Sequence, residues 1–218
     1  MQVTPAFSDF AEGYEGGQSK VVWTTLVADL ETPVSAYMKL AGDRPNSFLF
    51  ESVEGGAIIG RYSFLGLKPD LIWRCHGENA EINRNARYDS DSFVPCEGAA
   101  LNSLQALVEE SRIELPVGLP PMASCLVGYM GYETVRLMER LPDRNPDHLG
   151  VPDGMFVRPT VIAIFDRVED LVTVVTPIWP NPDQSAKAAY AQACERLSDV
   201  VEDFQQPLSD RRDAASES

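Results

Sequence analysis

Three polar side chains lie at the edges of two apolar segments in the stretch FESVEGGAIIGRYSFLG, residues 50–66. Glu51 and Ser52 end the first apolar run, SFLF, and Arg61 follows the second, AII. If the two runs pair as a hairpin through the glycine turn between them, Glu51 and Arg61 come from neighbouring strands. A carboxylate can accept from an ammonium group, a hydroxyl can add one hydrogen bond, and a guanidinium can bind a carboxylate bidentately. These groups therefore suit the two charged ends of a free amino acid.

A structural role accounts for the same residues without any ligand. Opposite charges on adjacent strands attract each other, and such an ion pair at the surface contributes under ~1 kcal/mol to stability. On the residues alone, this cross-strand ion pair between Glu51 and Arg61 is the preferred interpretation, and the amino-acid site is the alternative.

The charge balance argues against several classes of partner. The chain of 218 residues carries 33 acidic against 18 basic residues, a net charge of −15. A groove for nucleic acid and a surface for anionic lipid both need clustered Lys and Arg, so we expect no nucleic acid and no membrane partner. The apolar runs are too short for a transmembrane helix, and the N-terminus lacks the features of a signal peptide. We therefore expect a cytoplasmic protein.

The cysteines and histidines show no metal-binding pattern. No C-x-x-C motif occurs and neither histidine has a local partner, so we assign no zinc site. The expected state is four reduced, mostly buried thiols in a cytosolic protein. These residues are Cys75, Cys96, Cys125 and Cys194, together with His76 and His148.

Local signals in the first half of the chain predict helices and closely spaced strands. A helix begins after Thr32, an N-cap residue, with Pro33 in its first position, and it ends before Gly42. The segments SFLFES, AIIGRYSF, DLIWRCH and AEINR are typical of short strands. Strands at this spacing favour antiparallel hairpins over units in which a helix connects parallel strands.

Two helices and a hairpin are predicted in the second half. The segment AALNSLQALVEESR should place Leu101, Leu104 and Val108 on one apolar face. The segment PTVIAIFDRVEDLVTVVTP is the strongest strand signal and predicts a hairpin with a polar turn over residues 167–170. After Pro182, apolar residues recur at helical spacing and predict a long amphipathic helix.

The two ends of the chain are poor in apolar side chains. Residues 1–18 are predicted to form a flexible N-terminal arm and residues 207–218 a linker, because neither offsets its ordering entropy by burial. Residues 19–206 are expected to form the folded domain.

No known catalytic motif occurs in the sequence. Nucleotide-binding loops, a nucleophile elbow and the H-E-x-x-H zinc motif are absent from it. The spacing Gly128-x-x-Gly131 is interpreted as room for a strand to turn tightly into a helix. Adjacent carboxylates are interpreted as solvated surface, and we assign no catalytic residue and no metal ligand. These carboxylates are Glu109-Glu110, Glu169-Asp170 and Glu202-Asp203.

Several longer motifs resemble one known family. The strings FLFESVEGG…GRYSFLG, CLVGYMGYETVRLMERLP and RPTVIAIFDRVEDLVTVVTP are similar to the N-terminal region of anthranilate synthase component I. That protein is the large subunit of the first enzyme committed to tryptophan. The string DLETPVSAYMKL resembles the first helix of the family, and the resemblance covers roughly residues 20–200.

The resemblance implies an α+β fold, with a mostly antiparallel β-sheet covered by helices that forms half of a larger two-part α/β sandwich. Members of the family convert chorismate and ammonia to anthranilate and pyruvate with Mg²⁺. A glutamine amidotransferase subunit, component II, supplies the ammonia. Chorismate, Mg²⁺ and the catalytic groups belong to a C-terminal domain, and residues 207–218 resemble the linker toward it. We therefore expect a fragment, in preference to one product of a split gene, with no synthase activity of its own.

The resemblance also reverses the interpretation of the opening stretch. The family's tryptophan feedback site has a Glu-Ser dipeptide that matches Glu51 and Ser52, and a basic residue on the next strand that matches Arg61. Tryptophan is therefore the expected effector, at a site that lacks the contacts supplied by the other half of the subunit. Two alternatives stay open. One is the same region of aminodeoxychorismate synthase component I, and the other is a docking module for the amidotransferase subunit.

Overall fold

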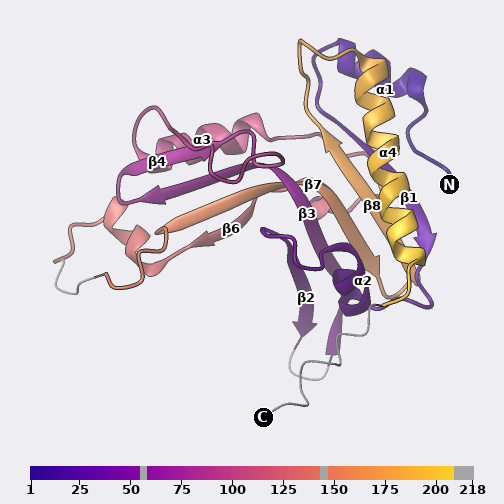
Figure 1. Cartoon of the computed structure of the whole chain (residues 1–218), viewed down its shortest axis with the longest axis horizontal. Coiled ribbons are helices and arrows are strands. Elements are labelled where there is room, and N and C mark those ends of the chain that lie inside the picture. The colour runs from indigo at the N-terminus through magenta and orange to yellow at the C-terminus, as the bar shows by residue number, and fades with distance from the viewer. Residues whose placement is uncertain (55–57, 143–146, 209–218) are drawn as a thin grey trace.

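The computed structural model describes residues 1–54, 58–142 and 147–208, with only the backbone described at residues 52–54, 58 and 59. Its centre is one antiparallel sheet with the strand order β1-β8-β7-β3-β4-β5, in which β2 also pairs with β3 and β6 with β7. Helices cover this sheet (Figure 1), and the predicted α+β class is confirmed. The strands are β1 Lys20–Val27, β2 Phe48–Glu54, β3 Ile58–His76, β4 Asn79–Asn83, β5 Val94–Pro95, β6 Val127–Met130, β7 Gly154–Asp166 and β8 Leu171–Ile178.

Strands β3 and β7 are the longest and run through both parts of the molecule. They pair from Tyr62 opposite Asp166 to Cys75 opposite Gly154, with an irregularity in register between Pro69 and Leu71. The prediction of two separate strands here is wrong. Lys68 adopts a φ of 51°, and this left-handed residue beside the irregularity lets the chain bend without leaving the sheet.

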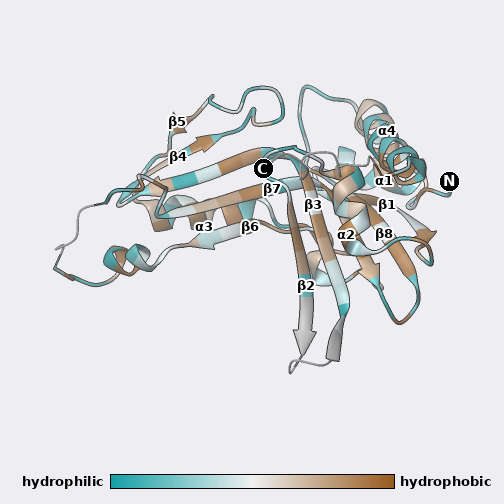
Figure 2. Ribbon diagram, turned by 60° about the horizontal axis from the view of Figure 1, so that its bottom comes forward, coloured by the Kyte–Doolittle hydropathy of each residue, from teal (hydrophilic) through white to brown (hydrophobic). Residues whose placement is uncertain are grey.

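Two helices follow the sequence signals closely. In α2, Pro33–Leu40, the Thr32 hydroxyl accepts from the Ser35 backbone N–H at 3.0 Å, as the capping signal predicts. Helix α4, Ala186–Gln205, packs an apolar stripe against β1 and β8, and its opposite face is hydrophilic (Figure 2). The hairpin of β7 and β8 is also confirmed, with its turn at residues 167–170.

The prediction of an undocked arm over residues 1–18 is wrong. Residues Phe7–Glu15 form helix α1, which lies against α4, and its Phe10 and Tyr14 are 0% and 6% exposed. Thr4 exchanges two backbone hydrogen bonds with Trp23 at 2.9 and 2.7 Å. The overall polarity of the segment conceals three aromatic residues at helical spacing, which bury enough area to dock the helix.

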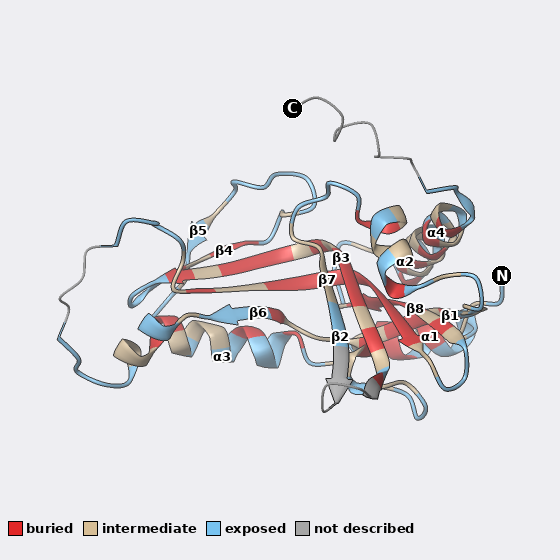
Figure 3. Ribbon diagram, turned by 90° about the horizontal axis from the view of Figure 1, so that it is seen from below, coloured by how far each residue is buried: buried red, intermediate tan, exposed pale blue. Residues whose placement is uncertain are grey.

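Helix α3, Ala100–Glu110, forms as predicted but turns a different face to the core. Ala100 and Leu107 are buried, Leu101 and Leu104 are half-buried, and Val108 is 46% exposed. The helix covers a second core around Trp73, whose indole N–H donates to the Ser103 hydroxyl at 3.0 Å. Figure 3 shows the buried centres of β3 and β7, with exposed residues along the outside of α3.

The segment after β6 is a 3-10 helix, η2 Tyr132–Leu137, where the sequence suggested an α-helix. A second 3-10 helix, η1 Pro121–Ala123, precedes β6. Gly128 lets β6 lie close to β7, because a Cβ at this position would lie 1.8 Å from the Met155 carbonyl oxygen on β7. Among the described residues, no helix combines the length and the apolar composition needed to cross a bilayer.

Candidate functional site

The predicted site residues lie at a corner where β2, β3 and β7 run side by side. Glu51 on β2 lies opposite Ser63 on β3, and Ser63 lies opposite Phe165 on β7. The turn that follows β7 is fastened to this corner, because the Arg167 backbone N–H donates to the Arg61 carbonyl oxygen at 3.0 Å. The neighbours of the predicted residues therefore come from a segment about a hundred positions further along the chain.

Arg61 binds a carboxylate, and that carboxylate is Asp166. The Nε atom of Arg61 is 3.0 Å from both carboxylate oxygens, and Nη2 is 2.6 Å from Oδ2. The guanidinium holds the pKa of Asp166 below its usual value through these hydrogen bonds. Asp166 also accepts from the Val168 backbone N–H at 3.0 Å and so shapes the turn. Arg61 remains 47% exposed, so solvent reaches the pair.

Glu51 binds a guanidinium, and that guanidinium belongs to Arg167. The Nη2 atom of Arg167 donates to Glu51 Oε1 at 2.8 Å and approaches the hydroxyl of buried Ser63 at 3.4 Å. The side chains of Glu51 and Arg167 are 37% and 30% exposed. This second ion pair is also open to exchange with water and with ligands.

The structure brings Glu51 and Arg61 to one corner but joins each to a different partner. The described residues include no ion pair between these two side chains, so the predicted cross-strand pair is wrong in its partners. The side chain of Ser52, the third predicted residue, lies outside the described residues. Asp166 at the end of β7 and Arg167 in the following turn were missed, because polar residues are expected beside a turn and call for no further explanation.

A small cavity of about 280 Å³ opens beside these groups. Its charged lining residues are Glu31, Glu51, Asp166, Arg167 and Asp170, and the first turn of α2 also lines it through Thr32, Pro33 and Val34. Phe165 and Leu171 add apolar surface. A cavity lined by both charged and apolar side chains is typical of a site for a small amphipathic ligand.

Comparisons with known proteins point to one family. The chain is 51% identical to anthranilate synthase component 1 of Cereibacter sphaeroides over 208 residues. This alignment covers 95% of the chain and 42% of the relative. The chain is a homologue of anthranilate synthase component 1. It is also 37% identical to the protein of that name from Synechocystis over 210 residues. That alignment covers 94% of the chain and 40% of the relative. The chain thus spans about two fifths of the length of these relatives.

A solved structure supports the fold. The crystal structure of anthranilate synthase component I from Streptococcus pneumoniae matches 84% of the chain and 36% of its own length, with a TM-score of 0.50 at 18% sequence identity. No protein-family model matches the chain. The homology with anthranilate synthase component 1 therefore rests on the relatives with higher identity.

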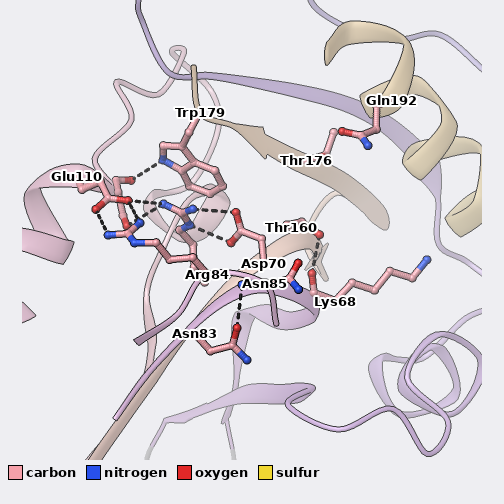
Figure 4. A network of polar contacts seen from close by, with 12 residues as sticks. Lys68, Asp70, Asn83, Arg84, Asn85, Glu110, Thr160, Thr176, Trp179 and Gln192 are labelled. Carbon is pink, nitrogen blue, oxygen red and sulfur yellow. Dashed lines mark hydrogen bonds and ion pairs between the residues drawn. The ribbon is translucent and has the colours of Figure 1, made fainter. Parts of the chain in front are cut away.

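A second polar cluster was missed by sequence reasoning (Figure 4). Arg158 on β7 is 7% exposed and binds Asp70 on β3 bidentately, at 2.9 and 2.8 Å. Its guanidinium lies 3.9 Å from the centre of the Trp179 ring. Glu110 binds Arg84 at 2.5 and 2.6 Å, and Arg84 holds the pKa of Glu110 below its usual value. Glu110 stays at the surface, as predicted, with a side chain that is 42% exposed, but the sequence did not show its ion pair with Arg84.

Neither cluster offers a metal site. The described residues contain no group of three or more His, Cys, Asp or Glu side chains placed to hold an ion. The donors of this part of the chain therefore do not fit the Mg²⁺ that the family resemblance implies. The four cysteines are free, and only Cys75 is fully buried. Burial raises the pKa of the Cys125 thiol to about 12, which keeps this thiol protonated and unreactive at neutral pH.

Proposed function

We propose that this chain is the N-terminal, tryptophan-sensing region of an anthranilate synthase component I subunit. The 51% identity to a protein of that name, over 95% of the chain, is the observation that carries this proposal. In the complete subunit, chorismate and ammonia derived from glutamine would be converted to anthranilate and pyruvate. A component II amidotransferase would be the partner that supplies the ammonia.

The sensing role is supported by what Glu51 and Arg61 already bind. Arg61 presents its fork to a carboxylate, and Glu51 accepts from a cation, so each group contacts the charge type that an amino-acid zwitterion carries. Tryptophan would place its carboxylate on Arg61 and its ammonium group on Glu51, with Ser52 adding a hydrogen bond.

The effector would have to replace two internal partners. Asp166 holds the position on Arg61 that a ligand carboxylate would take, and Arg167 holds the position on Glu51 that a ligand ammonium group would take. Exposed ion pairs contribute roughly 0.2–1 kcal/mol each, so this exchange costs little. Asp166 and Arg167 would thus compete weakly with the carboxylate and the ammonium group of the effector.

Catalysis is assigned to another part of the subunit. The described residues offer no cluster of metal-ligating side chains, so Mg²⁺ and the chemistry that it supports would belong to residues outside this chain. We expect the purified chain to form no anthranilate from chorismate, Mg²⁺ and ammonium salt, as followed by anthranilate fluorescence. Sustained turnover by the chain alone would contradict this assignment.

The sensing role is tested in the complete subunit that contains this chain. Arg61→Ala removes the proposed carboxylate partner, and losing a charge-assisted hydrogen bond costs roughly 1.5–3 kcal/mol. The tryptophan concentration for half-inhibition should therefore rise about ten- to a hundred-fold, with turnover in the absence of tryptophan nearly unchanged. Ser52→Ala should have a smaller effect.

Arg112→Ala is the control, because Arg112 is 70% exposed and its ion pair is with Glu109, three positions earlier in the chain. If tryptophan inhibited both Arg61→Ala and Ser52→Ala as strongly as the wild type, the sensing role of these residues would be contradicted. Only a structural role would then be left for them. Loss of turnover together with inhibition would show that they support the fold.

A further inference from the structure

The charged network around Arg158 borders a cavity that the proposed sensing role does not use. This cavity has a volume of about 580 Å³ and lies between β3, β7, the start of α4 and the loop after β8. Cavities of this size hold small organic molecules. Its wall includes Asp70, Glu110, Arg158, Trp179, Gln192 and Arg196.

Both carboxylates in this wall are already engaged. Asp70 receives two hydrogen bonds from Arg158, and Glu110 receives two from Arg84 and lies 3.6 Å from Arg158. Figure 4 shows the contacts of Glu110 with Arg84 and of Asp70 within this network, with the Trp179 ring beside them. The acids of the cavity are therefore neutralised by two arginines, and a third arginine is left over.

Arg196, on α4, is this third arginine. Its Nη1 atom lies 3.3 Å from the Thr176 hydroxyl and its Nη2 atom 3.0 Å from the Gln192 side-chain oxygen, so both contacts are with neutral groups. Its Nε atom is buried without a partner. Across the described part of the chain, no carboxylate lies within ion-pair distance of Arg196.

The surroundings of Arg196 do not compensate its charge. Burial lowers the pKa of its guanidinium, and the nearby charge of Arg87 lowers it further, while Asp70 acts in the opposite direction. An arginine nevertheless stays protonated in proteins. A partly buried cation without a counter-ion is costly, and proteins commonly satisfy such a group with an anion.

We infer that this cavity binds the carboxylate of a small organic acid, with Arg196 as the cation that holds it. Gln192 accepts from Arg196 through its oxygen, which leaves its amide N–H groups to donate to the ligand. Trp179 lines the same cavity and offers apolar surface to the body of the acid. This site is distinct from the corner of Glu51 and Arg61 and does not depend on the proposed tryptophan site.

The test uses the whole chain labelled with ¹⁵N, with benzoate as the probe and benzamide as its neutral counterpart. Benzoate should shift the side-chain N–H signal of Arg196 saturably, and benzamide should not. Arg196→Gln should weaken benzoate binding about tenfold or more, because one charge-assisted hydrogen bond is lost. Binding to the variant is followed through the backbone signals of Trp179 and Gln192.

Lys187→Gln is the matched control, since it removes one positive charge from an exposed position on the same helix. It should leave benzoate binding unchanged, as should Arg61→Ala. Gln192→Leu, which keeps Arg196, should weaken binding by a smaller factor and gives a second variant if Arg196→Gln does not fold. Equal affinity for benzoate and benzamide, no saturable shift in the wild-type chain, or undiminished binding in both cavity variants would overturn the inference.

Discussion

Two arginine–aspartate pairs of nearly the same geometry occupy different environments in this molecule. Arg61 and Asp166 have side chains that are 47% and 16% exposed, whereas Arg158 and Asp70 are 9% and 31% exposed. In both pairs the guanidinium binds its carboxylate bidentately. The environment of such a pair, and not the contact itself, therefore decides whether it can open for a ligand.

The physical reason is desolvation. A charge that leaves the Arg61 pair is immediately hydrated, so breaking the pair costs roughly 1 kcal/mol or less. In the second pair, Arg158 has a side chain that is only 9% exposed, so its charge would be poorly hydrated and strongly unfavourable without a partner. The first pair is suited to exchange with an effector, and the second holds β3 and β7 together below the Trp179 ring.

The largest expected effect comes from breaking the buried pair. Arg158→Ala removes two charge-assisted hydrogen bonds to Asp70 and the contact with Trp179, so the free energy of unfolding should fall by about 3 kcal/mol. Urea denaturation of the chain measures this change. Arg61→Ala, measured in parallel, should lower the free energy of unfolding by under ~1 kcal/mol. Equal losses in the two variants would remove the distinction between the pairs.

At the exposed pair, removing the charge of Asp166 should have a smaller effect. Asp166→Asn keeps a side-chain oxygen for the turn but removes the charge that competes for Arg61. Tryptophan should then inhibit the complete subunit at a concentration lower by up to about fivefold, since an exposed pair is worth roughly 0.2–1 kcal/mol. Glu169→Gln, which removes a negative charge from the same turn, is the control. Weaker inhibition in Asp166→Asn would show that Asp166 supports the site instead of competing with the effector.

Local structure was predictable wherever the deciding interactions lie close in sequence. The cap of Thr32 on α2, the hairpin of β7 and β8 and the stripe of α4 all depend on neighbours within a few residues. The docking of α1 was also visible in principle, because its aromatic residues have helical spacing. It was missed because the polarity of the whole segment was weighed above that spacing.

The partners of the candidate site could not be predicted in the same way. Asp166 lies 105 positions from Arg61, and Arg167 lies 116 positions from Glu51. The sequence alone pairs Glu51 with Arg61 across the expected hairpin, because it does not show that β7 runs beside β3. The same distance concealed the pair of Arg158 and Asp70, which are 88 positions apart. The sequence offered one signal for this pair, which was the charge of Arg158 shortly before the apolar run of β7.

The unbroken course of β3 and β7 has a consequence for cooperativity. Leu65, Leu67, Val161 and Ala163 belong to the core under α1, α2 and α4, while Leu71, Trp73 and Cys75 belong to the core under α3. The same two strands therefore contribute to both cores, and neither core can lose its strands without disrupting the other. The bend at Lys68 redirects the sheet without dividing it, so the two parts of the molecule should melt as one thermodynamic unit.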